Sequence, residues 1–276
     1  MLNNKLHKDA GTYGTYLVSF VVALLILTVN PAEAEKWVDE TRKTLHGLTG
    51  EIGVSEVIKI GAPAYHHIRS LMERGCEKAL DAFPELVAEE LSKVAEYGGA
   101  ELEFGDNCER RAKRTLIKAA SYLPAWVIRR IPALEAWTVI GRGRFRQYAS
   151  GRVVIKTNVV KLSLHELGHV FEHSAGHLLR LRKEFYENRT RGRTPKKLNG
   201  WRLPFGYRPD EKYKAGFVTR YMGKEDGVEV YSCGLEYVFF NSHDIWRRDP
   251  EAAKFLLGSL IFYGNQVSGR LFTQKR

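Results

Sequence analysis

Four histidines recur at a spacing of four within one stretch of the sequence, SLHELGHVFEHSAGH: His165, His169, His173 and His177. On a helix, side chains four residues apart lie one above the other, so two histidines can bind one metal ion from adjacent turns. Glu166 directly follows the first histidine and completes the pentad His-Glu-Leu-Gly-His. In this arrangement two imidazoles bind zinc and the glutamate acts on water beside the metal. The pentad predicts zinc ligands at His165 and His169, with Glu166 as general base.

The two later histidines do not fit the same ion. A helix rises 1.5 Å per residue, so His173 lies about 12 Å along the axis from His165. The longer pattern H-E-x-x-H-x-x-G-x-x-H also fails, because Glu172 and Ala175 occupy its glycine and last histidine positions. We therefore expect a single helix with His173 and His177 on its solvated face. We expect Glu172 to support one of the metal ligands.

A third ligand must come from elsewhere in the chain. Zinc at hydrolytic sites commonly takes two histidines and one carboxylate, and keeps a fourth position for water. The segment EDGVEVYSCGLEYVF carries Glu229 and Glu236, which are seven residues apart and therefore share one helix face. Glu229, at the start of that helix, is the expected ligand. Glu236 is the alternative ligand or a residue that supports the site.

The elements around the pentad predict an α+β fold that is mostly helical. Two β-rich runs, Trp137–Ile140 and Arg152–Lys156, precede the histidine helix and predict a small sheet beside it. The second run could offer a free edge to an extended polypeptide substrate. Late in the chain, Asp249 followed by Pro250 predicts a helix start.

The N-terminus predicts export. A basic start, the apolar run Leu17–Val29 and the small residues Ala32-Glu33-Ala34 are typical of a signal peptide over residues 1–34. An uncleaved membrane anchor is the alternative. Residues 35–108 are predicted to form a helical N-terminal region, and residues 109–276 a second domain. In an oxidising compartment Cys76 could pair with Cys108, although buried free thiols fit the sequence equally well.

The net charge of +11, from 43 Lys and Arg against 32 Asp and Glu, favours anionic partners. Much of the positive charge lies in residues 179–208, within a polar stretch from Arg182 to Lys214 that reads as a long loop. This basic segment could select an acidic substrate or bind an anionic surface. The sequence carries no signature of a nucleic-acid-binding fold, so no specific nucleic acid is expected.

The pentad and the late helix resemble lethal-factor-type zincins and the metallopeptidase-like domains of phage and mobile-element proteins. The resemblance covers about residues 109–276 and implies a zincin-like domain that hydrolyses peptide bonds in polypeptide substrates with Zn²⁺. It also implies that Glu229 completes the metal site and that Tyr221 assists at the transition state. Two other functions are compatible with the sequence. One is a catalytically silent zinc-binding structural or assembly protein of a phage or mobile element, and the other is a basic protein that binds nucleic acid or an anionic surface.

Overall fold

The structure is a computed structural model, and its description covers most of the chain. The described residues are 31–48, 52–74, 83–98, 100–138, 144–147, 153–173, 175–198, 211–240 and 242–265. The predicted signal-peptide run Leu17–Val29 and Cys76 lie outside them. Ala32-Glu33-Ala34, the expected cleavage site, lies in the first turn of a helix. Within the described part of the chain, no helix is both long and apolar enough to cross a membrane.

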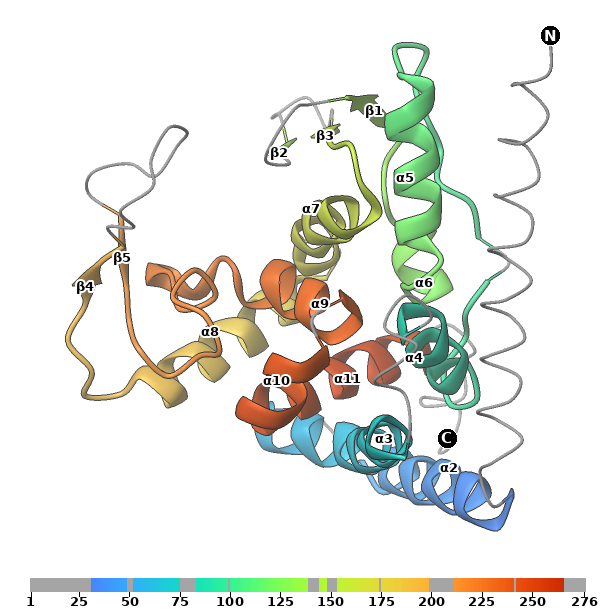
Figure 1. Ribbon diagram of the computed structural model, residues 1–276, viewed down its shortest axis with the longest axis vertical. Helices are drawn as coiled ribbons and strands as arrows, with labels where there is room; N and C mark the ends of the chain where they lie inside the picture. The colour runs from blue at the N-terminus through green and yellow to red at the C-terminus, as the bar shows by residue number, and fades with distance from the viewer. Residues whose placement is uncertain are drawn as a thin grey trace, which may run out of the picture.

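Helices make up most of the described structure, which confirms the predicted mostly helical α+β class (Figure 1). Those before the sheet are α2 (Pro31–His46), α3 (Val54–Glu73), α4 (Phe83–Ser92), α5 (Arg110–Ala120) and α6 (Ala125–Ile128). Those after the sheet are α7 (Val160–His173), α8 (Gly176–Thr190), α9 (Val230–Phe240), α10 (Ser242–Arg248) and α11 (Pro250–Asn265). A short 3₁₀ turn, η2 (Glu225–Gly227), precedes α9. The expected helix start at Asp249 is confirmed, because its Oδ1 accepts a hydrogen bond from Ala252 N at 3.2 Å.

The sheet before α7 has three strands in the order β1-β3-β2. They are β1 (Leu134–Trp137), β2 (Arg144–Gln147) and β3 (Val153–Lys156); β1 runs parallel to β3, and β2 antiparallel to it. The prediction of a strand directly before the pentad helix is confirmed. The first predicted strand, Trp137–Ile140, was placed too late in the sequence, because β1 ends at Trp137. The strand β2 was not predicted. The prediction that β3 has a free edge for a substrate is wrong, because it is the central strand of the sheet and is paired on both sides.

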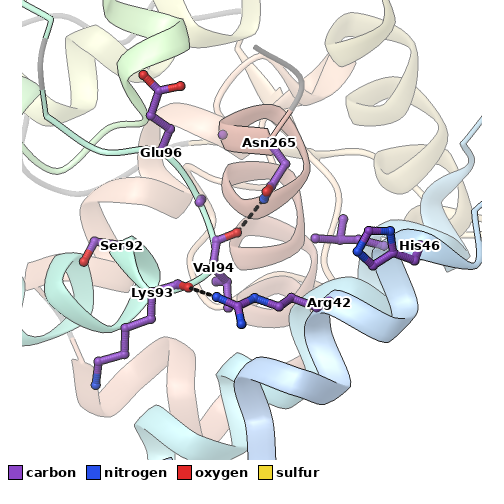
Figure 2. Close-up of a pocket in the computed structure, with 10 residues that line it drawn as sticks. Arg42, His46, Ser92, Lys93, Val94, Glu96 and Asn265 are labelled. Atoms are coloured by element: carbon purple, nitrogen blue, oxygen red, sulfur yellow. Dashed lines mark hydrogen bonds between the residues drawn. The ribbon is translucent and has the colours of Figure 1, made fainter. Parts of the chain in front are cut away.

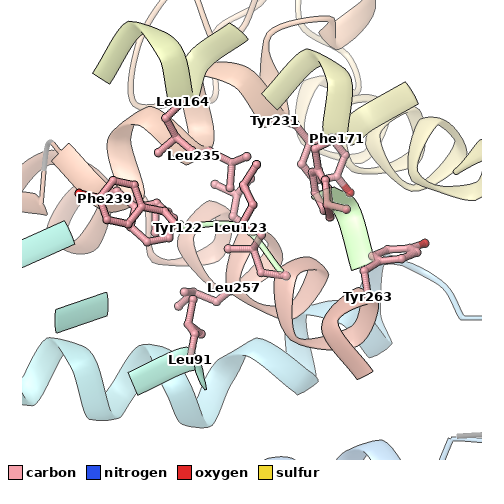
Figure 3. Packing of buried hydrophobic residues seen from close by; sticks show 14 of the residues in the cluster. Leu91, Tyr122, Leu123, Leu164, Phe171, Tyr231, Leu235, Phe239, Leu257 and Tyr263 are labelled. Carbon is pink, nitrogen blue, oxygen red and sulfur yellow. The ribbon is translucent and has the colours of Figure 1, made fainter. Parts of the chain in front are cut away.

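The N-terminal helices and the last helix share one buried apolar cluster. A Cβ on Gly61 of α3 would lie 1.9 Å from Lys254 O, and one on Gly258 of α11 would lie 1.9 Å from Val57 O. The two helices therefore cross with their backbones in contact, which only residues without a side chain permit. Figure 3 shows the packing around this region, with Leu91 of α4 close to Leu257 of α11. Residues on both sides of position 108 thus contribute to the same core.

The histidine stretch divides between two helices, so the expectation of one continuous helix is wrong. α7 ends at His173 and α8 begins at Gly176. His173 is exposed, as expected, but His177 is half-buried and its ring lies 4.8 Å from that of Tyr263. Its expected place on a solvated face is therefore also wrong. The apolar contact with Tyr263 gives His177 a packing role in α8.

The expected long loop from Arg182 to Lys214 is helical at its beginning. α8 continues to Thr190, because Leu178, Leu181 and Phe185 bury one face of it in the core. A short antiparallel pair follows, β4 (Lys196–Lys197) with β5 (Lys212–Tyr213). Residues 199–210, which connect the two strands, lie outside the described part of the chain.

Cys108 is a free thiol in the structure, whereas Cys76, the partner considered for it, lies outside the described residues. Its Sγ donates to Leu134 O at 3.2 Å and accepts a hydrogen bond from Ala136 N at 3.3 Å. Both contacts are to the backbone of β1. The thiol therefore helps to hold the segment before α5 against the edge of the sheet.

Candidate metal centre

Gly168, inside the pentad, allows α7 to contact α9 directly. A Cβ at this position would lie 2.6 Å from Ser232 Cα and 3.0 Å from Ser232 N. Because both are backbone atoms, no side-chain rotation could relieve such a contact. The absence of a side chain at Gly168 therefore sets the spacing of the two helices, and with it the distance between the histidines of α7 and the glutamate at the start of α9.

The two histidines of the pentad and Glu229 form one cluster. Glu229 Oε2 lies 3.5 Å from Nε2 of His165 and 3.5 Å from Nε2 of His169. The three potential ligand atoms all lie within 4.8 Å of one another. Around a tetrahedral zinc ion with bonds of about 2.0–2.1 Å, neighbouring ligand atoms are roughly 3.3 Å apart. The geometry and the donor types of this cluster therefore fit a metal ion.

A tight turn presents Glu229 to the histidines. Asp226 and Gly227 both have positive φ, at 70° and 68°, and a Cβ on Gly227 would lie 2.8 Å from the Tyr186 ring. The turn therefore packs against α8, and the chain enters α9 with Glu229 just before its first residue. The Glu229 carbonyl accepts the first helical hydrogen bond, from Cys233 N at 3.0 Å.

The two carboxylate oxygens of Glu229 have different neighbours. Oε2, which faces both imidazoles, also accepts a hydrogen bond from Ser232 Oγ at 2.7 Å. Oε1 lies 3.8 Å from Nζ of Lys224, and Lys224 is itself 3.1 Å from Glu211 Oε1. The side chain of Glu229 is only 5% exposed. These contacts hold the carboxylate in one orientation, with a single oxygen towards the cluster.

Glu236 contacts the other nitrogen of the His165 ring. Its Oε2 lies 3.0 Å from His165 Nδ1, and its Oε1 lies 3.1 Å from Lys161 Nζ. The sulfur of Cys233 is also near this nitrogen, at 3.9 Å. Glu236 therefore orients His165 from behind, whereas Glu229, just before α9, lies against both Nε2 atoms. A carboxylate behind a metal-binding histidine fixes its ring and raises its basicity.

We expect Glu236→Gln to weaken zinc binding by about 10- to 100-fold, because the amide does not carry the charge that stabilises His165 as a donor. Competition with a chromophoric chelator measures the affinity. Glu73→Gln, at an exposed residue whose partner is Arg69, is the matched control and should bind zinc like the unaltered protein. Equal affinities in the two variants would contradict this role of Glu236.

The ionisable groups of the cluster leave one proton for a metal to displace. Burial opposes a charge on His165, but hydrogen bonds with Cys233, Glu229 and Glu236 outweigh it and raise the pKa of His165 well above its usual range. Burial lowers the pKa of His169 to about 4. Burial opposes the ionised form of Glu229, yet its contacts with His165 and His169 lower its pKa to about 2. These shifts favour a proton on His165, the neutral form of His169 and the ionised form of Glu229.

Zinc binding is expected to release about one proton at neutral pH, because His165 must lose its proton before it can bind the metal. Affinity should rise with pH by up to about tenfold per unit while His165 is protonated in the free protein. Calorimetric titration in buffers of different ionisation enthalpy counts the protons released. An affinity that does not change between mildly acidic and mildly alkaline pH would contradict the assignment.

Glu166 lies in the same buried environment and is 4% exposed. Burial raises its pKa to about 7; His165 acts in the opposite direction, whereas the charges of Glu229 and Glu236 raise it further. A carboxylate with a pKa near the working pH can both take and return a proton. Glu166 is thus electrostatically coupled to the cluster and suited to general acid–base chemistry.

Two further residues considered from sequence lie near the cluster. The ring of Tyr221 stacks beside that of His165, with centroids 6.2 Å apart and planes at 21°. Glu172 is 1% exposed and pairs with Arg182, which ties the last turn of α7 to α8. Burial raises the pKa of Glu172 to about 7, while Arg182 acts against this shift. Tyr221 therefore borders the site, whereas the ion pair of Glu172 connects two helices.

A separate cavity of about 410 Å³ lies where the C-terminal ends of α2, α4 and α11 meet (Figure 2). Arg42 donates to the Lys93 carbonyl, and Asn265 donates to the Val94 carbonyl. These side chains satisfy carbonyl groups near the end of α4. The residues that line the cavity include none of the His-Glu cluster. The concentration of potential metal ligands thus lies elsewhere, between α7 and α9.

Comparisons of the chain with protein families, with curated proteins and with solved structures find no match. The function of the protein is therefore inferred from the residues of the cluster and from their geometry.

Proposed function

We propose that the protein is a zinc-dependent metallopeptidase of the zincin type. The observation that carries the proposal is the position of one carboxylate oxygen, 3.5 Å from the Nε2 atoms of two histidines on adjacent turns. Two imidazoles and one carboxylate are a donor set that zinc favours in hydrolytic enzymes, with a position left for water. Their burial also strengthens electrostatic effects on a bound substrate.

In this proposal His165, His169 and Glu229 hold the zinc ion. When bound, zinc acts as a Lewis acid towards a scissile carbonyl and makes water nucleophilic near neutral pH. Glu166 takes a proton from the attacking water and passes it to the leaving amine. Tyr221 donates a hydrogen bond to the oxygen that becomes negatively charged in the transition state.

An extended polypeptide substrate would pair with β2. The outer edge of β1 is already occupied, because Leu134 N donates to Glu103 O and Gly105 N donates to Leu134 O, both at 2.9 Å. β3 is paired on both sides, so β2 is the outer strand of this sheet among the described residues. β2 also lies against α7. Strand addition there would bring a main chain towards the helix that carries the pentad.

A structural zinc protein without catalysis is the nearest alternative. Such a protein needs the two histidines and Glu229, with Glu236 to orient His165, but it gives no role to the buried carboxylate of Glu166. Glu166 costs folding energy when it is ionised in this environment, which its raised pKa reflects. A catalytic role gives a reason for a glutamate at this position, and we therefore favour the enzyme.

Metal analysis combined with a peptide-library digest tests the proposal. We expect stoichiometric zinc in the purified protein, cleavage of library peptides, loss of cleavage with 1,10-phenanthroline and recovery when zinc is returned. Calcium should not restore activity, because it prefers six to eight oxygen ligands. Zinc binding without any cleavage would favour the structural alternative, and absence of zinc binding would contradict both.

A further inference from the structure

The segment that leads from the end of α8 to the metal centre is strongly basic. Between Arg189 and Lys224, the residues that the structure describes include nine Lys and Arg against one acid, Glu211. We call residues 191–198 and 211–213 the basic hairpin, since they contain β4 and β5. Its exposed basic side chains are Arg191, Arg193, Lys196, Lys197 and Lys212.

Two lysines of the basic hairpin face each other across the strands. Lys197 pairs with Lys212 in the register of β4 and β5, and both side chains are exposed. Like charges directly opposite each other destabilise an antiparallel pair. None of Lys196, Lys197 and Lys212 has an acidic partner among the described residues. An anion bound between Lys197 and Lys212 would remove their repulsion.

The positive charge is present on both faces of the hairpin. Successive strand residues point to opposite sides, so Lys196 and Lys197 lie on different faces. A flat lipid surface would meet only one of these faces. A flexible chain that carries several carboxylates can contact both, which favours an acidic polypeptide.

An ion-pair chain connects the basic hairpin to the metal centre. Glu211, next to Lys212, pairs with Lys224 at 3.1 Å, and Lys224 Nζ lies 3.8 Å from Glu229 Oε1. Tyr213 of β5 also forms a β-bridge with Lys224. Figure 1 shows β4 and β5 extending from the body of the molecule beside α8. A polypeptide held on the hairpin therefore lies close to the ligand Glu229.

We propose that the basic hairpin binds an acidic segment of the polypeptide substrate, and thereby directs cleavage to peptide bonds near clusters of Asp and Glu. This inference rests on the proposed peptidase function. It adds a substrate class to that function, through residues that take no part in metal binding.

The test uses the Glu166→Gln variant, so that peptides bind without being cut. Fluorescence anisotropy measures binding of a labelled oligoglutamate peptide to this variant and to the same variant with Lys196, Lys197 and Lys212 changed to Glu. The matched control changes three exposed basic residues on other elements to Glu: Lys36, Lys59 and Arg111. We expect the hairpin substitutions to weaken peptide binding by about tenfold or more, and the control substitutions to weaken it less. Peptide binding by both variants should fall as the salt concentration rises.

Equal losses in the hairpin and control variants would show only a general effect of charge and would overturn the inference. Tighter hairpin-dependent binding of oligothymidylate, or of phosphatidylglycerol vesicles, would identify a nucleic acid or a membrane as the partner instead. Zinc affinity of each variant is measured in parallel. Intact zinc binding and cleavage without a preference for acidic peptides would overturn only the role of the hairpin. Oligoglutamate binding without zinc or cleavage would overturn the peptidase and leave an anion-binding surface.

Discussion

Replacing Glu166 by Gln is expected to lower kcat/KM for peptide hydrolysis by about a thousandfold while zinc stays bound. General acid–base groups contribute typically about 10²–10⁴ to rate, and an amide cannot accept the proton of the attacking water. The substitution leaves the three ligands unchanged. Glutamine is also neutral at every pH, so the metal-free variant should unfold at the same temperature as the unaltered protein or a higher one at alkaline pH, where the buried Glu166 is ionised.

Glu187→Gln provides a control for a change of one charge. Glu187 is exposed, and its partner on the surface of α8 is Lys183. This variant should keep full activity. If Glu166→Gln retained hydrolysis, another group would be the general base. If the variant lost zinc binding as well as activity, Glu166 would be needed to maintain the metal site and its role in catalysis would not be shown.

Gly168→Ala is expected to damage the metal centre although it changes no ligand. The added Cβ would lie 2.6 Å from Ser232 Cα, so α7 and α9 must move apart. Overpacking of this kind typically costs about 1–3 kcal/mol. A binding site needs its groups held within about 0.5 Å, so zinc affinity should fall by about tenfold or more. Thermal unfolding with and without zinc, together with chelator competition, measures both effects.

Gly176→Ala is the matched control for this substitution. Gly176 begins α8, and a Cβ there would meet nothing within 4 Å. The control should be as stable as the unaltered protein, or slightly more stable, because alanine loses less backbone freedom on folding. Unchanged zinc affinity in Gly168→Ala would show that the two helices can adjust, and would contradict the proposed role of their contact.

Short-range patterns in the sequence predicted a large part of what the structure shows. The pentad places His165 and His169 one turn apart, a property of any helix, and Asp249 with Pro250 marks a helix start by local chemistry. Glu229 could be predicted as the third ligand because it is the carboxylate at the start of the helix predicted in the segment EDGVEVYSCGLEYVF. These predictions depend on residues within a few positions of one another or on the known donor preferences of a metal.

The remaining features depend on contacts between distant segments. β3 lies between β1 and β2 because of how the chain returns between strands, and its own residues do not reveal which edge is covered. The polar composition after Arg182 suggested a loop, whereas burial of Leu181 and Phe185 makes the segment helical. From the sequence, Gly168 was only a residue of the pentad between His165 and His169, with no predicted role of its own. Its importance becomes visible when the backbone of Ser232 lies against it.

The contact between Gly61 and Gly258 has a consequence for how the chain acquires its structure. One member lies in α3 and the other in α11, so all of the chain between these two helices must be synthesised before they can meet. Until then the apolar face of α3 has no α11 to cover it. Such non-local closure slows folding and leaves intermediates prone to aggregation. The newly made protein should therefore depend on chaperones until α11 has left the ribosome.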